Sequence, residues 1–124
     1  MGPEPQHLAV NLAVVRGQLS RAPERRSLPS GDELVAYEVT VRVAGAAAES
    51  VPVVQIAPTS VPDVGAGDTV VVVGRVRRRF FRAGGVTASR TELVAERVVA
   101  ASTARSVDAA LRTATTRLDA ARRR

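Results

Sequence analysis

The chain has 124 residues, of which 45% are hydrophobic and 2% aromatic, and it contains no cysteine and a single histidine. This length fits one domain with a short appendage. The cysteine count excludes disulfides, thiolate metal sites and cysteine nucleophiles, and one histidine disfavours His-rich metal sites and Ser-His catalysis. No apolar run reaches the roughly 18 residues of a membrane span, and no leader pattern opens the chain. We therefore expect a soluble, cytoplasmic, non-enzymatic domain with no metal, cofactor, membrane or small-molecule substrate.

The charge is unevenly distributed, and all 18 basic residues are arginine. Residues 1–73 carry five arginines and eight acidic residues, whereas residues 74–104 carry seven arginines and two glutamates. Residues 105–124 add six arginines and two aspartates, and the net charge of the chain is +6. A basic half beside a mildly acidic half points to a polyanionic partner.

The first half of the chain predicts two strands and a loop after a loose lead-in. Residues 7–20 are rich in valine and leucine and predict a strand with a bulge or bend at Gly17. Residues 21–33 contain two prolines, a glycine and a concentration of charge, and they predict a loop. Residues 34–43 alternate between larger apolar side chains and small or polar ones, which is the pattern of a half-buried strand.

The second half predicts three further strands. Residues 51–57 form the third, and residues 58–67 are too poor in helix formers to hold more than one helical turn. A fourth strand runs from about Asp68 to Phe81, Gly84-Gly85 supplies a turn, and residues 86–100 form a fifth strand with a bulge. Five short strands with short connections, and no alternation with helices, predict a small antiparallel barrel.

The last twenty residues predict a helix. Apolar residues recur there at alternating spacings of four and three, which is the seam of an amphipathic helix: Val107, Leu111, Ala114, Leu118 and Ala121. Thr103 or Ser106 could cap this helix, Asp108 suits its first turn, and Arg122–Arg124 suit its C-terminal dipole. This apolar stripe packs either on the barrel or on another chain.

The most informative segment is GRVRRRFFR, residues 74–82. Alternate side chains of a strand share a face, so we expect one face to carry Arg75, Arg77, Arg79 and Phe81 and the other to carry Val76, Arg78 and Phe80. Spaced guanidiniums suit phosphates, and an aromatic ring suits an unpaired base. Five arginines in eight residues with no acid among them repel one another, which favours nucleic-acid contact over a merely solvated edge. We expect Phe80, like Tyr37, to pack in the core.

Weaker candidates lie elsewhere in the chain. The loop cluster of Arg21, Arg25 and Arg26 is either a second phosphate contact or a surface cluster. Arg16 and Arg42 interrupt apolar runs and either reach the same groove or lie outside it. Asp63 and Asp68 lie in a Gly/Pro loop, where isolated carboxylates are typical turn formers rather than metal ligands.

Four segments, in order, resemble the bacterial single-stranded DNA-binding proteins (SSB family). NLAVVRGQLSRAPERR from Asn11, followed by PSG at residues 29–31, resembles that family's opening NxVxLxGxLxxDPExR…PSG pattern. VAY at residues 35–37 resembles its second strand, GD…GRVR over residues 67–77 resembles its GDxVxVxGxLR strand, and TELVAE at residues 91–96 resembles its closing TEIVAE. Together these segments span roughly residues 11–99.

The resemblance implies an OB-fold, a five-stranded Greek-key barrel, here followed by an amphipathic helix. The chain then divides into a flexible lead-in (1–6), an OB domain (7–101) and a basic helix (102–124). The resemblance also implies a homo-oligomer, dimer or tetramer, that holds single-stranded DNA on the nucleoid during replication, repair or recombination. Phe81 matches the family's stacking aromatic, Arg77 and Arg79 its basic strand positions, and Arg26 the arginine after DPE. With Arg75 and Arg42, these are the expected nucleic-acid-binding residues.

Among the departures of the chain from the family, two bear directly on function. Residues 45–57 carry none of the further stacking aromatics, and a basic helix stands where the family has an acidic tail, so the chain resembles a short, divergent member. An alternative interpretation is therefore an OB-fold protein-interaction subunit, similar to primosomal proteins, that binds DNA weakly or not at all and assembles through its C-terminal helix. Nothing in the sequence distinguishes DNA from RNA.

Overall fold

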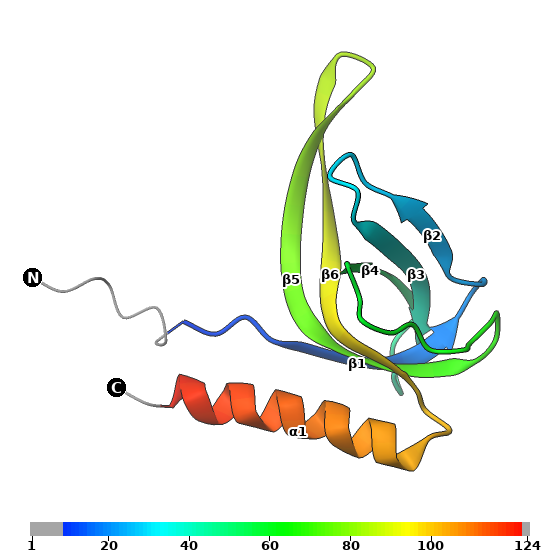
Figure 1. The fold of residues 1–124 in the computed structure, drawn as a ribbon, viewed down its shortest axis with the longest axis vertical. Helices are drawn as coiled ribbons and strands as arrows, with labels where there is room; N and C mark the ends of the chain where they lie inside the picture. Colours follow the sequence, from blue (N-terminus) through cyan, green and yellow to red (C-terminus); the bar gives the residue numbers. More distant parts are fainter. Residues whose placement is uncertain (1–8, 123–124) are drawn as a thin grey trace, which may run out of the picture.

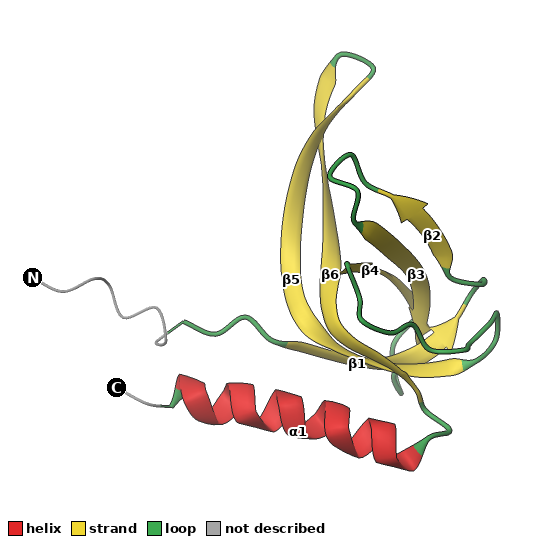
Figure 2. Cartoon of the chain, viewed as in Figure 1, coloured by secondary structure: helices red, strands yellow, loops and turns green. Residues whose placement is uncertain are grey.

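The computed structural model of the chain describes residues 9–122, and it consists of six strands followed by one helix (Figures 1 and 2). The elements are β1 (Ala13–Leu19), β2 (Glu24–Ser27), β3 (Glu33–Val41), β4 (Glu49–Ile56), β5 (Thr69–Ala83), β6 (Val86–Ala100) and α1 (Ala104–Ala121). The predicted lead-in and the first two residues of the predicted strand 7–20 lie outside the described residues. The mainly-β class with one C-terminal helix is as predicted.

The strands form one sheet in the order β1-β5-β6-β4-β3-β2, and an additional pairing between β1 and β3 joins five of them into a ring. That closing pair matches Gln18 with Thr40 and Leu19 with Val39. Every pairing is antiparallel except that of β4 with β6. The predicted antiparallel arrangement is thus wrong for this one pair, whose strands are connected through β5 rather than by a hairpin.

The interior of the ring is built from small aliphatic side chains. The alternation of residues 34–43 directs Val35 and Val39 inward, where both are fully buried beside Val70 and Val72. Tyr37 is 3% exposed, which confirms its predicted place in the core. Its hydroxyl donates a 2.8 Å hydrogen bond to Oε1 of the buried Gln55, so neither polar group is left unpaired. Burial raises the pKa of Tyr37 to about 12.

We predicted a bulge or a bend at Gly17; the structure has no bulge there, and the glycine allows a close approach between strands. The β1–β5 register runs without interruption through it. A Cβ atom here would overlap the carbonyl oxygen of Thr40 and lie 2.8 Å from Cγ1 of Val39, at the point where β1 passes from β5 to β3. The bulge predicted within residues 86–100 is confirmed, because the register with β5 shifts between Val73 and Gly74.

The predicted loop 21–33 contains a strand, β2, which pairs with β3. Its two prolines, Pro23 and Pro29, lie on either side of the strand and therefore do not remove ladder hydrogen bonds. Arg25 of β2 binds Glu33 of β3 through both Nε–Oε2 (2.7 Å) and Nη2–Oε1 (2.9 Å). This paired hydrogen bonding lowers the pKa of the Glu33 carboxyl.

Helix α1 packs on the outer face of β5 and β6, so the helix docks within its own chain (Figure 2). Ala110 and Ala114 are buried against Val73, with Leu12 and Val99 at the edges of the contact. Arg117 pairs with Glu96, and Nε of Arg97 donates to Oγ1 of Thr113 at 2.9 Å, which ties the helix to β6.

The predicted helix seam is only partly correct. Ala114 is buried, but Leu111 and Leu118 are 44% and 53% exposed, because the small alanines let the helix lie close to the sheet on a neighbouring stripe. Thr103 is the N-cap residue, as one of the two predicted alternatives had it, but its side chain makes no capping bond. Asp108 lies past the first turn, contrary to our prediction, because the helix begins at Ala104. Arg122 follows the helix as its C-cap, and residues 123–124 lie outside the described residues.

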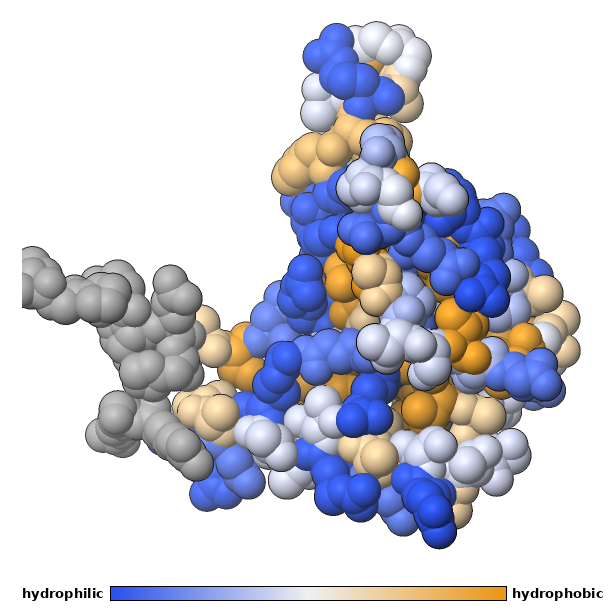
Figure 3. All heavy atoms as spheres, in the orientation of Figure 1, coloured by the Kyte–Doolittle hydropathy of each residue, from blue (hydrophilic) through white to orange (hydrophobic). Residues whose placement is uncertain are grey.

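The hairpin of β5 and β6 extends well beyond the ring (Figures 1 and 3). β5 pairs with β1 only as far as Gly74, and β6 pairs with β4 only from Leu93 onward. Between these points residues 75–92, here called the arm, form ladder pairs only within the β5–β6 hairpin. At the tip, Gly84 and Gly85 have φ angles of 58° and 80°, which a tight hairpin turn requires.

The side chain of Asn11 holds the base of the arm. Its amide donates to the carbonyl oxygen of Val76 (2.7 Å), and its Oδ1 accepts from the backbone N–H of Val76 (2.9 Å). This pair of bonds imitates a ladder pair, so it continues the β1–β5 pairing past the end of β1. The direction in which the arm leaves the ring is therefore fixed by a hydrogen-bonded residue.

Candidate nucleic-acid interface

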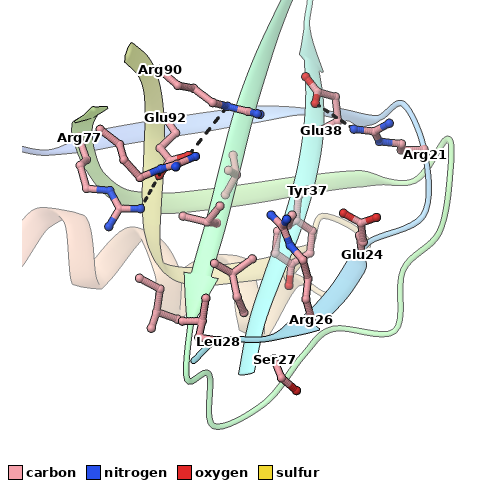
Figure 4. Close-up of a pocket in the computed structure, with 16 residues that line it drawn as sticks. Arg21, Glu24, Arg26, Ser27, Leu28, Tyr37, Glu38, Arg77, Arg90 and Glu92 are labelled. Atoms are coloured by element: carbon pink, nitrogen blue, oxygen red, sulfur yellow. Dashed lines mark hydrogen bonds and ion pairs between the residues drawn. The ribbon is translucent and has the colours of Figure 1, made fainter. Parts of the chain in front are cut away.

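A groove of about 560 Å³ lies on the outer face of the sheet, between the segment that contains β2 and the base of the arm (Figure 4). Its floor is apolar, because the residues that alternate with the buried core of β3 and β4 face outward here. Leu34 and Val54 pack together with Val94 beneath it. The apolar lining consists of Leu28, Leu34, Ala36, Tyr37, Val53, Val54 and Ile56.

The walls of the groove are charged. Five arginines and three glutamates line it, with the arm on one side and the β2 segment on the other (Figure 4). The arm contributes Arg77, Arg79, Arg90 and Glu92. The opposite wall contributes Arg21, Glu24 and Arg26, and Glu38 lies 3.5 Å from Arg21. The arm wall has three arginines and one glutamate, whereas the two arginines and two glutamates opposite balance each other. An apolar floor beside a cationic wall can hold a ligand that is flat and apolar in one part and anionic in another.

Glu92 organises the arginines of the arm. It is 3% exposed, and its Oε2 accepts hydrogen bonds from Arg77 and, at 3.3 Å, from Nε of Arg79. Nε of Arg90 lies 3.9 Å from Oε1. Burial alone would raise the pKa of Glu92, but the hydrogen bonds and charges of Arg77 and Arg79 outweigh it, so the pKa is lowered. The carboxylate stays ionised and holds the guanidiniums at the groove.

Arg77 retains unused donor capacity. Its Nε is buried and has no hydrogen-bond partner within the described part of the chain. A buried N–H that lacks a partner is costly. Arg77 is thus tied to Glu92, and its side chain as a whole remains 31% exposed.

The four residues predicted to share one face of β5 do not all line the groove. Arg77 and Arg79 both reach Glu92 and line the groove. Arg75 precedes them, exposed and without an ion pair in the part of the chain that the structure describes. Phe81 follows them farther out, 37% exposed, with the guanidinium of Arg79 5.1 Å from its ring centroid.

Phe80 is not in the core, contrary to our prediction. Its side chain is 64% exposed, because no element of residues 9–122 covers this part of the arm. The guanidinium of Arg78 lies 5.3 Å from its ring centroid. An acid does neutralise part of the arginine row, although none lies within it in sequence, since Glu92 lies opposite Arg77 on the neighbouring strand.

The other residues that the sequence analysis singled out lie in different parts of the surface. Arg26 lines the groove. Arg42 is exposed beyond the end of β3 and does not line it, and Arg16 borders a different hollow. The carboxylate of Asp68 accepts a 2.8 Å hydrogen bond from the backbone N–H of Gly65, which confirms its predicted turn-forming role.

Sequence reasoning missed Glu92, Arg90 and the apolar floor. A signal for Glu92 was present in the sequence. A two-residue turn at Gly84-Gly85 fixes the hairpin register, and counting back from it places Arg77 opposite Glu92, as the structure has it. The floor had no such signal, because it depends on β2 and the arm bordering the same face of β3 and β4.

Metal-binding clusters and membrane-spanning helices are both absent from residues 9–122. No group of three or more His, Cys, Asp or Glu side chains in that range is placed to hold a metal ion. Among the same residues, no helix combines the length and the apolar character needed to cross a membrane.

Comparison with known proteins gives no family assignment. No model of a known protein family matches this chain, and no curated protein sequence matches it significantly. The geometry of the groove and the arm is therefore the basis for a functional interpretation.

Proposed function

We propose that this chain is an OB-fold protein that binds single-stranded DNA in the groove, without sequence preference and without catalysis. The observation that carries the proposal is the position of the groove. Apart from the short β2, the ring strands in chain order are β1, β3, β4, β5 and β6. OB-folds bind oligonucleotides on the face of their second and third strands, between the loop joining strands one and two and the loop joining strands four and five.

The groove occupies the corresponding place. Its floor lies on β3 and β4, its β2 wall belongs to the connection from β1 to β3, and its other wall is the base of the arm. The ring-like pairing of the strands supports an OB barrel, and so does the resemblance in sequence to the SSB family.

The chemistry of the groove suits an unpaired strand. Guanidiniums donate several hydrogen bonds in a fixed planar arrangement that matches phosphate oxygens, and Arg77 and Arg79 present such groups along one wall. The apolar floor can receive base faces, and the exposed ring of Phe81 can stack on a base beyond it. None of these contacts reads a base edge, which is why we propose binding without sequence preference.

Such a protein would act on the nucleoid in the cytoplasm, during replication, repair or recombination, and as a homo-oligomer, as the resemblance implies. The proposal requires no cofactor, metal or catalytic residue.

The direct test is a titration of the purified chain with oligo-dT, oligo-rU and duplex DNA at several salt concentrations. We expect oligo-dT to bind more tightly than the duplex. The affinity should fall linearly on a log–log plot against salt, with a slope of about −0.7 per phosphate contacted. Equal affinity for single strand and duplex would contradict the proposal, and tighter binding of oligo-rU would redirect it to RNA.

The variant Phe81→Ala tests the stacking contact. Because base–aromatic stacking contributes about 1–3 kcal/mol per base, we expect oligo-dT binding to weaken by that amount with the salt slope unchanged. Val86→Ala, which shortens another exposed apolar side chain on the arm, is the matched control and should leave affinity unchanged. If Phe81→Ala bound as tightly as the parent, the charge contacts alone would carry the binding.

A second candidate function, assembly of copies through α1, is favoured by one observation. Leu111 and Leu118 are exposed on the helix and are seven residues apart, so they lie along one side of it. The double variant Leu111→Glu/Leu118→Glu should dissociate an oligomer held by this stripe. Light scattering after gel filtration measures the mass, and an unchanged mass with DNA binding intact would remove this candidate.

A further inference from the structure

The arm has a second face, directed away from the groove side, that the proposed function leaves unused. Alternation along β5 sets Val76, Arg78 and Phe80 on the side opposite to Arg77, Arg79 and Phe81. Ser89 pairs with Phe80 across the hairpin and so shares its side. We call Val76, Arg78, Phe80 and Ser89 the far arm face.

The far arm face repeats the construction of the groove side. On the groove side Arg79 lies over Phe81 at 5.1 Å, and on the far side Arg78 lies over Phe80 at 5.3 Å. Arg78 is held in place, because its Nε and Nη2 lie 3.3 Å and 3.2 Å from Oγ of Ser89. Both faces thus present an aromatic ring backed by an oriented cation.

The ring on the far arm face is the more exposed of the two. Phe80 is 64% exposed against 37% for Phe81, and Val76 beside it is 48% exposed. An exposed phenyl ring is unfavourable in water unless a partner covers it. The guanidinium shields part of this ring, and the exposed remainder can receive another flat group.

Charge identifies the partner as a polyanion. The arm contains six arginines and one acidic residue, Glu92, which belongs to the groove side. The far arm face therefore carries a cation and no acid. A strand with a phosphate at every nucleotide and a flat base between phosphates complements this pattern better than a protein surface of mixed charge.

We propose that the far arm face is a second stacking site for single-stranded nucleic acid, with Phe80 stacking a base and Arg78 contacting its phosphate. This inference rests on the proposed function. A strand that fills the groove continues around the arm and reaches the opposite face. The path is short, because the arm is only two strands wide. Short oligonucleotides fill the groove alone, whereas long ones engage both rings.

The absence of tryptophan from the chain makes the two sites separately observable. Phe80→Trp and Phe81→Trp each introduce one fluorophore that stacks as phenylalanine does, and Val86→Trp is a control on the same arm. Each variant is titrated with oligo-dT of about 6 and about 20 nucleotides, because an OB fold covers about 4–16. We expect the short strand to quench only Phe81→Trp, and the long strand to quench Phe80→Trp as well.

The affinities of alanine variants provide an independent readout. Phe80→Ala should weaken binding of the long strand about five-fold or more, with the affinity for the short strand unchanged. Phe81→Ala should weaken both, and Val86→Ala neither. Phe80 belongs to no core cluster of the described residues, so the variant should fold, and its far-UV circular dichroism should match that of the parent.

The outcomes separate the two proposals. If the parent binds oligo-dT and Phe81→Trp is quenched, but Phe80→Trp is not quenched by the long strand, the second site is wrong and the first stands. The second site is equally excluded if Phe80→Ala loses the same affinity for both lengths. If neither tryptophan variant is quenched and the parent does not bind, the proposed function itself fails.

Discussion

The two halves of strand β5 have opposite chemistry on one continuous backbone. Residues 70–74 are four buried valines and a buried glycine, whereas nearly every residue of the second half, 75–83, is exposed and five of its nine are arginines. Both halves pair with β6. They differ in what else surrounds them, because β1 and α1 cover only the first half.

A strand can therefore contribute to the core and to a candidate binding surface without a change in secondary structure. In the ring, the outward face of β5 carries Val73, which α1 buries completely. A few residues farther along, the same face carries Arg77 and Arg79 at the groove. The change of environment occurs at Gly74, which makes this glycine the place to test the division.

We expect Gly74→Ala to have the largest effect on stability. A Cβ atom at Gly74 would overlap the carbonyl oxygen of Val94 and lie 2.8 Å from Cα of Ala95, so the backbone of β6 must shift. Overpacking of this kind costs about 3 kcal/mol. Chemical denaturation measures the loss, with Gly65→Ala as the control, since no atom lies within 4 Å of a Cβ there. Equal stability of the two variants would show that ring and arm are not rigidly joined.

A smaller effect, dependent on pH, is expected from Glu92→Gln. The folded protein lowers the pKa of Glu92 below the value of about 4.3 for an unfolded glutamate. The ionised carboxylate therefore stabilises the fold above that pH, and the contribution is lost as the pH falls through the lowered pKa. Its hydrogen bonds to two arginines are worth about 1.5 kcal/mol.

Denaturation curves between about pH 6 and pH 2.5 test this expectation. The parent should lose about 1.5 kcal/mol more than Glu92→Gln over that range, so the two stabilities converge in acid. Glu49→Gln, at an exposed position of β4, controls for the loss of one negative charge and should follow the parent. Parallel curves for the parent and Glu92→Gln would mean that the ion pairs of Glu92 contribute nothing to the stability of the fold.

The sequence predicts the strands of the ring because their patterns are local. Alternation over residues 34–43 correctly places Val35, Tyr37 and Val39 in the core, and the predicted bounds of the strand 86–100 are those of β6. The wrong predictions arise where burial depends on whether another element covers the strand. The local sequence around Phe80 predicts a core residue. Phe80 is exposed because no element of the described residues covers it on the arm.

The groove could be predicted only in part for the same reason. Alternation puts Arg77 and Arg79 on one face, and the hairpin turn puts Glu92 opposite them. That this face also borders Arg26 depends on β2 pairing with β3, a four-residue strand between two prolines that no periodicity indicates. Arg42 illustrates the converse, since its interruption of an apolar run marks the end of β3 rather than a groove contact.

The smallest predicted effect distinguishes arginines that are held by Glu92 from one that is not. Arg75→Gln should change stability by less than about 0.5 kcal/mol, because Arg75 is an exposed residue away from any core cluster. Arg75 shares a face of β5 with Arg77 and Arg79, so we nevertheless expect the variant to reduce the salt slope for oligo-dT by about 0.7. Arg42→Gln is the matched control. Arg42 is also exposed and outside the groove lining, but it lies beyond the end of β3 instead of on the arm, so this variant should leave the slope unchanged. Identical slopes for Arg75→Gln and the parent would limit the phosphate contacts of β5 to Arg77 and Arg79. A reduced slope for Arg42→Gln would mean that the nucleic acid leaves the groove past the end of β3 instead of along the arm.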